Sequence, residues 1–188
     1  MIEFILFVVV ALAPAIVLHE YAHGWVADRL GDPTARLSGR LTVNPIKHVD
    51  PFGSILFPGI LFLLHSPVML GWAKPVPVNF YRLGHPKRDM MLVALAGPAV
   101  NIVLAFLCAQ ILRAGIVGGL LSKALVGAFE LNLILAVFNM MPIPPLDGSR
   151  IISGFLPDSL ARVYGKLEPY GLLIVLALLQ LGVFQVIY

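Results

Sequence analysis

The sequence predicts a mostly α-helical, polytopic membrane protein: a bundle of about four to five transmembrane helices, with a re-entrant or interfacial segment and short membrane-associated β-strands. Of its 188 residues, 59% are hydrophobic and only 12% are charged, whereas soluble domains carry about 25% charged residues. The mean hydropathy is +0.92. This length suits one compact bundle, so we expect residues 1–188 to form a single domain.

Four strongly apolar stretches predict the membrane-spanning helices, and a fifth stretch is weaker. The strong stretches cover about residues 2–27, 90–112, 120–141 and 170–188. No basic residue precedes the first one, so we expect it to be kept and not removed as a signal peptide. The weak stretch, Phe52 to Gly71, is interrupted by glycines and prolines. It either crosses the membrane or forms the re-entrant or interfacial segment.

Two loop segments have patterns typical of short β-strands. Leu37, Leu41 and Val43, together with Thr42, lie in the loop after the first stretch. The second segment is GWAKPVPVNFYRL, residues 71–83. Its prolines cannot donate hydrogen bonds to a neighbouring strand, so we expect an edge strand here.

The sequence HEYAHG, from His19 to Gly24, ends the first apolar stretch. His19 and His23 are four residues apart, so on a helix they lie on one face and both can bind one metal ion. Glu20 lies beside the place where water would meet that metal, which makes it the candidate general base. The alternative is that these are ordinary polar side chains at a helix end. Ionisable groups within a membrane span are costly and usually functional, which favours the metal site.

A third metal ligand is best sought at the end of the fourth stretch, in FNMMPIPPLDGSR. Pro142, Pro144 and Pro145 end a helix there. Irregular backbone at membrane depth is tolerated where it lines a wet cavity or is buried in protein. Asp147 is the acidic residue of this break and the candidate oxygen ligand. The alternative is that Asp147 only caps a short helix that extends through Ile152.

The topology follows if Asp147 and the two histidines form one site. Both lie at the carboxyl ends of apolar stretches, so these two stretches must cross the membrane in the same direction. An odd number of crossings then separates them, which makes Phe52 to Gly71 the stretch that does not cross. Basic residues on both sides of it indicate the cytoplasm. They are Arg29, Arg36, Arg40 and Lys47 before it, and Lys74, Arg82, Lys87 and Arg88 after it. We therefore expect a multi-pass protein of the cell membrane whose site opens toward the cytoplasm.

The net charge of +3 and the pI near 9.2 could suggest a nucleic-acid partner. The basic residues, however, form no stripe and have no stacking aromatic residues around them, so we expect no such partner.

Three further polar residues are candidates for the site. Asn101 is an amide within an apolar stretch, and two roles stay open for it: a hydrogen bond between helices that sets their packing, or contact with a substrate. His48 and Asp50 lie in the loop after the first stretch. We do not expect them to bind the metal, because the two histidines and Asp147 already fill the protein positions of a catalytic zinc site.

Several motifs, in this order, resemble the site-2 protease family of intramembrane zinc metalloproteases. They are HEYAHG, AGPAVN at residues 96–101 and NMMPIPPLDG at residues 139–148. The intervening GRLTVNPIKHVDPFGS and GWAKPVPVN resemble the small, single-module members, which lack PDZ and CBS domains. The Asp-Gly-Gly that is common in the family is Asp-Gly-Ser here, which leaves the aspartate in place.

The resemblance implies one zinc ion per chain, bound by His19, His23 and Asp147, with Glu20 as the catalytic residue. It also implies that Asn139 holds the substrate or the developing oxyanion near the metal. The implied activity is the hydrolysis of peptide bonds in transmembrane substrates, as in regulated intramembrane proteolysis. The expected substrates are single-span membrane proteins or remnant peptides.

A peptide bond in a helix is shielded, so a membrane substrate must unwind before water can attack it. We hypothesise that the segment Val76, Pro77, Val78 and Asn79 pairs with the extended substrate by strand addition. Two rival functions remain: a metal-ion transport protein and a catalytically inactive membrane scaffold. A transporter needs charged groups along a path across the bilayer, which the sequence lacks, and the intact Glu20 argues against a scaffold.

Overall fold

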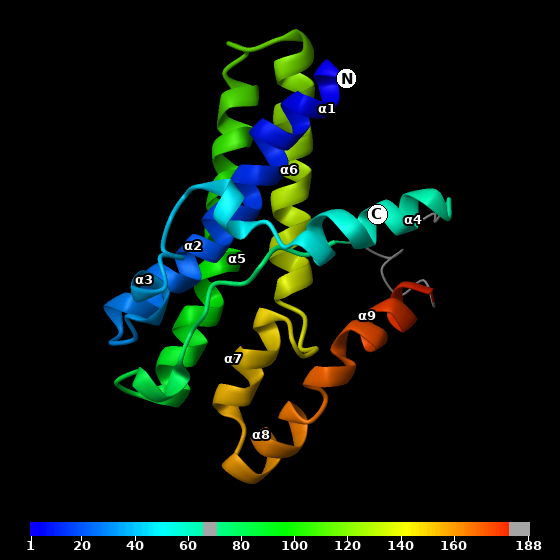
Figure 1. The fold of residues 1–188 in the computed structure, drawn as a ribbon. Helices are drawn as coiled ribbons and strands as arrows, with labels where there is room; N and C mark the ends of the chain where they lie inside the picture. Colours follow the sequence, from blue (N-terminus) through cyan, green and yellow to red (C-terminus); the bar gives the residue numbers. More distant parts are fainter. Residues whose placement is uncertain (66–70, 181–188) are drawn as a thin grey trace.

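The computed structural model describes residues 1–65 and 71–180, and the regular structure in this part of the chain is helical (Figure 1). The α-helices are α1 (Ile2–Phe7), α2 (Ala13–Arg29), α3 (Thr34–Leu37), α4 (Phe57–Leu63), α5 (Pro86–Arg113), α6 (Gly119–Asn139), α7 (Asp147–Phe155), α8 (Asp158–Gly165) and α9 (Gly171–Gln180). Short 3₁₀ turns lie at Pro45–His48, Phe80–Arg82 and Glu168–Tyr170, and π-helical turns lie at Val8–Leu12 and Pro51–Leu56.

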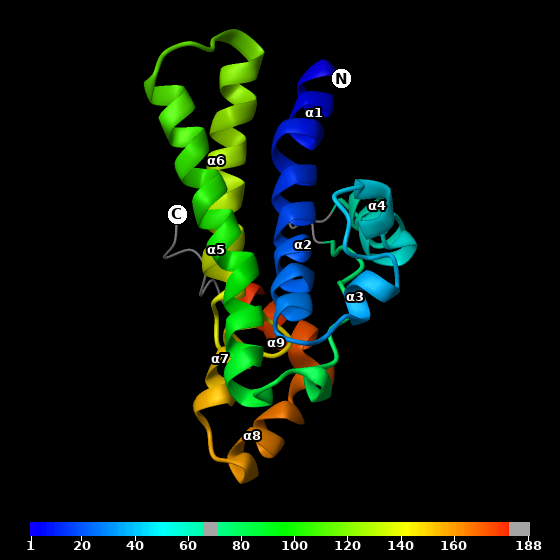
Figure 2. The same ribbon diagram turned by 90° about the vertical axis from the view of Figure 1, so that its left-hand side faces the viewer.

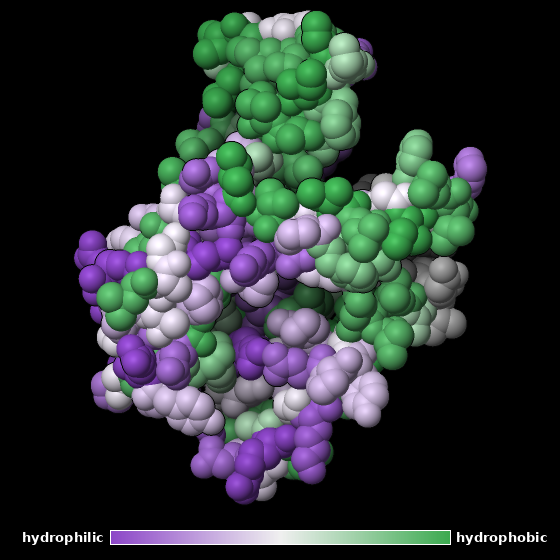
Figure 3. All heavy atoms as spheres, viewed as in Figure 1, coloured by the Kyte–Doolittle hydropathy of each residue, from purple (hydrophilic) through white to green (hydrophobic). Residues whose placement is uncertain are grey.

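Three described helices are long and apolar enough to cross a membrane. The first is continuous from Ile2 to Arg29 and consists of α1, a π-helical turn and α2. The others are α5 and α6. Figures 1 and 2 show these three helices side by side, with α5 in contact with both α2 and α6. Their outward surface is strongly hydrophobic in the upper part of the molecule (Figure 3). The chain is therefore a membrane protein.

The predicted number of four to five transmembrane helices is larger than the three in the described residues. The stretch predicted at residues 170–188 begins as the apolar helix α9, and residues 181–188 lie outside the described part. The weak stretch forms an apolar helix from Pro51 to Leu63, which is shorter than the ~20 residues that a span requires. Figure 1 shows α4 crosswise to α5 and α6. This arrangement agrees with a non-crossing segment, whose residues 66–70 lie outside the described part.

The directions of the helices also agree with the parity argument. In Figure 1, α2 and α6 run in the same direction and α5 runs in the opposite one. The carboxyl ends of α2 and α6 therefore lie at the same end of the bundle, where α7 begins.

The prediction of β-strands is wrong for the described residues, which contain no strand. Leu37 ends α3, and residues 41–43 form an irregular loop. Residues 71–79 are not helical, but their backbone has no ladder partner. The acceptors for this segment are loop carbonyls and side chains instead: Trp72 N–H donates to Gly53 O, and Lys74 N–H donates to His48 O. Pro75 and Pro77 have no N–H at all.

Candidate metal centre

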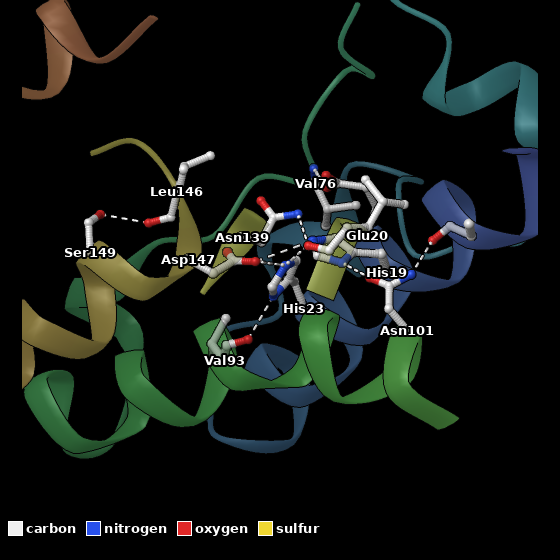
Figure 4. A network of polar contacts seen from close by, with 12 residues as sticks. His19, Glu20, His23, Val76, Val93, Asn101, Asn139, Leu146, Asp147 and Ser149 are labelled. Carbon is white, nitrogen blue, oxygen red and sulfur yellow. Dashed lines mark hydrogen bonds and ion pairs between the residues drawn. The ribbon is translucent and has the colours of Figure 1, made fainter. Parts of the chain in front are cut away.

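Three potential ligand atoms meet where the end of α2 approaches the start of α7. Nε2 of His19 and Nε2 of His23 are 3.0 Å apart. Oδ2 of Asp147 lies 3.3 Å from the first and 3.4 Å from the second. Figure 4 shows the three side chains pointing toward one another. All three atoms lie within 4.8 Å of one another, so one ion can bind to all of them.

Asp147 reaches the histidines because the chain turns sharply after α6. The helix ends at Asn139, the proline-rich segment follows, and α7 begins at Asp147. The alternative role as a cap is not observed, because no side chain of residues 1–65 or 71–180 caps this helix. Instead, Ser149 Oγ donates to Leu146 O at 2.6 Å, which stabilises the first turn (Figure 4). The Asp147 carboxylate is therefore available to a metal.

Hydrogen bonds at the Nδ1 atoms of the two imidazoles orient the rings so that both Nε2 atoms face the candidate metal centre. His23 Nδ1 donates to the carbonyl oxygen of Val93 at 2.7 Å. His19 Nδ1 lies 2.6 Å from Asn101 Oδ1. This oxygen must accept, because the Asn101 amide nitrogen donates to Ala15 O at 3.1 Å and to Asn132 Oδ1 at 2.8 Å. In the neutral rings both protons therefore lie on Nδ1, and both Nε2 atoms present lone pairs.

These lone pairs fit a cation. Two unprotonated nitrogens cannot hydrogen-bond to each other, although the Nε2 atoms are at hydrogen-bond distance. Asp147 Oδ2 is buried and has no hydrogen-bond partner among the residues that the structure describes. Such converging electron pairs repel unless a positive charge lies between them. Two imidazoles and one carboxylate, with outer nitrogens held by hydrogen bonds, form a donor set typical of catalytic zinc.

Asp147 is suited to this role in its ionised state. Burial by itself raises the pKa of the Asp147 carboxyl, but hydrogen bonds and positive charge from the His19 and His23 imidazoles, when these rings carry a second proton on Nε2, lower it by more. The pKa consequently lies below its usual value, and the group is a carboxylate at neutral pH.

Gly97 of α5 allows the helices to approach closely enough to enclose the imidazoles. A Cβ atom at this position would lie 2.6 Å from His19 Nε2 and closer still to His23 Nε2. Any other residue would thus occupy the space next to the ligand atoms. The glycine of the AGPAVN motif is required here by packing.

Glu20 lies next to this centre and faces the same cavity. Its Oε2 accepts a hydrogen bond of 2.7 Å from the backbone N–H of Val76. Val76 is only 7% exposed, so the extended segment around it covers the glutamate. Figure 4 shows Val76 and Glu20 in contact beside His19.

A cavity of about 680 Å³ adjoins the site. Both histidines, Glu20, Asp147 and Asn139 line it, together with mostly apolar side chains. Figure 3 shows this face of the molecule hollowed between the apolar upper part and the more polar lower part. A cavity of this size accommodates a short stretch of extended peptide.

The structure brings only part of the predicted substrate segment to the cavity. Val76 and Val78 line it. Pro77 and Asn79 do not, and the backbone N–H of Asn79 donates to Oδ2 of Asp32 at 2.6 Å. Asp32, fully buried, thus holds this end of the segment. Sequence reasoning missed Asp32, although an Asp-Pro-Thr turn is a signal for a side chain that bonds to nearby backbone.

Asn139 and Asn101 occupy different places. Asn139 ends α6 and lines the cavity, and its Nδ2 donates to Leu135 O at 3.0 Å. Asn101 is fully buried behind His19 and does not line the cavity. The contact of Asn101 with substrate stays a prediction, and in the structure its hydrogen bond orients His19. Asn132 supports Asn101 from the neighbouring helix.

The loop residues His48 and Asp50 lie apart from His19, His23 and Asp147. His48 is buried, and its Nε2 contacts Thr42 O at 2.8 Å. Asp50 accepts from Gly53 N–H at 2.6 Å and so caps the helical segment that starts at Pro51.

Arg150 was missed: it lines the cavity, and its position three residues after Asp147 places it on the same helix face.

The chain is similar to several known proteins. It is 38% identical over 184 residues to "Putative zinc metalloprotease YwhC" of Bacillus subtilis, covering 92% of this chain and 79% of that protein. It is 31% identical over 173 residues to "Putative zinc metalloprotease Rip2" of Mycolicibacterium smegmatis, covering 86% of this chain but only 62% of Rip2. A shorter match, 43% identical over 60 residues, is to "Putative zinc metalloprotease MJ0611" of Methanocaldococcus jannaschii, covering 32% of this chain and 31% of that protein.

No family model matches the chain. No solved structure matches it either. The similarity to YwhC extends over 92% of the chain. The relatives named here are zinc metalloproteases, and His19, His23 and Asp147 form a group that could hold such an ion. The chain therefore belongs to the zinc metalloprotease family that includes YwhC.

Proposed function

We propose that the chain is an intramembrane zinc metalloprotease of the site-2 type that hydrolyses peptide bonds of transmembrane substrates. The observation that carries this proposal is the convergence of His19, His23 and Asp147 beside Glu20. This group lies at the ends of helices apolar enough to span a membrane. The names of the relatives support a protease, and the location of the site supports cleavage at the membrane.

When zinc is bound, it supplies Lewis-acid chemistry that acidifies water and polarises the scissile carbonyl. Glu20 accepts the proton of the attacking water and then passes it to the leaving amine. The Val76 N–H holds one oxygen of Glu20, which leaves the other oxygen for this proton transfer. Asn101 keeps the His19 ring in the required tautomer.

Asn139 is suited to stabilise the negative charge that develops on the substrate carbonyl oxygen. It lines the cavity, and its amide nitrogen carries two hydrogens. One is donated to Leu135 O, and the other is available to an oxyanion.

The segment around Val76 and Val78 is the proposed docking site for the unwound substrate. Both residues line the cavity, and the Val78 N–H has no acceptor among the described residues. An extended peptide that pairs with this backbone would pass beside the three ligand atoms. Pairing through the backbone requires no particular substrate sequence, which suits single-span proteins and remnant peptides.

The proposed site opens toward the cytoplasm of a multi-pass protein in the cell membrane. The support is the charge bias of the loops. Basic residues cluster in the part of the sequence that connects α2 to α5, which indicates a cytoplasmic segment.

The test is Glu20→Gln, compared with Glu130→Gln on the exposed face of α6. Both variants should retain one zinc ion per chain. Cleavage of single-span membrane proteins should fall about 10²- to 10⁴-fold in Glu20→Gln, because general base catalysis is lost, and should not change in Glu130→Gln. Trapping in native membranes with Glu20→Gln then identifies the substrates. Cleavage that persists in Glu20→Gln contradicts the proposal, and so does the absence of cleavage by the wild-type protein.

A further inference from the structure

Arg150 is the one lysine or arginine among the described residues that line the metal cavity. It follows Asp147 by three residues on α7, so the two side chains share a helix face. Three residues of helix correspond to ~4.5 Å along the axis. A permanent positive charge thus lies about one turn from a metal ligand, in a cavity whose lining is mostly apolar.

The surroundings of Arg150 hold its guanidinium but leave most of its donors unused. The Cζ atom lies 5.4 Å from the centre of the Phe80 ring, so the group rests on an aromatic face. Its Nη2 donates to Oε1 of Glu168, in the turn before α9. No other hydrogen bond of this side chain exists within the described residues. A guanidinium has five N–H donors in a planar fork, which suits two-point binding of a carboxylate.

We propose that Arg150 forms a carboxylate-binding subsite for the substrate, next to the metal centre; this rests on the proposed protease function. In the described structure the Arg150 guanidinium binds the carboxylate of Glu168. When substrate binds, a substrate carboxylate replaces that of Glu168. Replacing Glu168 costs little free energy because its side chain is 45% exposed, and exposed ion pairs are weak. An extended peptide advances ~3.3–3.6 Å per residue, so the carboxylate belongs within about two residues of the cleaved bond.

Two sources of the carboxylate have the same chemistry. One is an aspartate or glutamate side chain of the substrate, and the other is the terminal carboxylate of a remnant peptide. The test therefore uses matched peptides with Glu, Gln or Lys at each position near the cleaved bond, each with a free or an amidated carboxyl terminus.

Binding of these peptides is measured in the Glu20→Gln background, so that the measurement does not depend on cleavage. The Glu peptide, or the free-terminus peptide, should bind about tenfold more tightly than its neutral partner, as for a charged hydrogen bond. Arg150→Gln should abolish this ratio. Glu168→Gln should increase it, because the internal competitor is removed while Arg150 stays.

A double variant with the two charges exchanged distinguishes binding of a substrate carboxylate from a purely structural link between α7 and α9. In Arg150→Glu with Glu168→Arg, the ion pair can form again, but the charge at the cavity is inverted. A preference that changes to Lys peptides supports the subsite. A preference of the double variant for the Glu peptide overturns the proposal. An equal loss of binding for all peptides in Arg150→Gln also overturns it, and so does the absence of binding by any peptide. If the preference is measured but the wild-type protein cleaves nothing, the subsite stands and the protease function fails.

Discussion

The backbone N–H of Val76 donates a 2.7 Å hydrogen bond to Oε2 of Glu20. The segment that covers the cavity is thereby attached to the side chain proposed as the general base. Gly24 of the HEYAHG motif makes this contact possible, because a Cβ there would lie 2.8 Å from Cγ1 of Val76. The glutamate, the glycine and the covering segment thus form one packed unit.

Val76→Pro tests this attachment. The substitution removes the N–H, so Glu20 loses its partner and the segment loses a contact point. We expect substrate turnover to fall about tenfold or more, in line with the loss of a hydrogen bond to a charged group, while zinc content stays at one per chain. Turnover and zinc content are measured on the same preparation.

Val78→Pro is the matched comparison, because it removes an N–H that has no acceptor in the described chain. It should raise KM through weaker pairing with the substrate but should change kcat less than Val76→Pro does. Unchanged turnover in both variants would contradict the docking role of the segment.

Local patterns predicted the parts of this molecule that depend on neighbouring residues. The apolar stretches predicted the three long helices, and the spacing of His19 and His23 placed both on one helix face. The proline-rich break predicted a helix end before Asp147, and α6 ends at Asn139. Each of these signals depends on residues within one or two turns of one another.

The failures concern contacts between distant segments. The residues around Val76 were predicted as a strand, but their hydrogen bonds go to side chains of the first helix and its following loop, Glu20 and Asp32. No local pattern encodes these acceptors. The sequence leaves two roles open for Asn101, because it does not show that the helix face of this residue meets His19. The close approach at Gly97 depends on the same crossing of helices.

Gly97→Ala should remove zinc from the protein. The added methyl group would lie 2.6 Å from His19 Nε2, so the imidazoles must move apart or α5 must shift. We expect zinc content well below one per chain by elemental analysis. Gly59→Ala in α4 is the control, because no atom of the other described residues lies within 4 Å of its Cβ position. Full zinc occupancy in Gly97→Ala would show that the helices can separate without disturbing the site.

Asn101→Ala should weaken zinc binding without direct loss of a ligand. His19 Nδ1 then lacks the acceptor that fixes its tautomer, and such partners typically contribute 10- to 100-fold in metal affinity. Competition with a chelator measures the affinity. A raised KM at unchanged zinc affinity would instead support the substrate contact that the sequence left open.

Removal of zinc should destabilise the protein, because three electron-rich atoms then face one another without a cation. Nε2 of His19 and Nε2 of His23 are 3.0 Å apart, and within the described part of the chain Asp147 Oδ2 has no other partner. Free zinc at 100 times its Kd stabilises the folded state by about 2.7 kcal/mol. Thermal unfolding in detergent, with chelator and with added zinc, should therefore show a higher Tm with zinc. Asp147→Ala should lose most of this difference because it removes a ligand. An equal gain in Tm for Asp147→Ala would place the stabilising zinc elsewhere on the molecule.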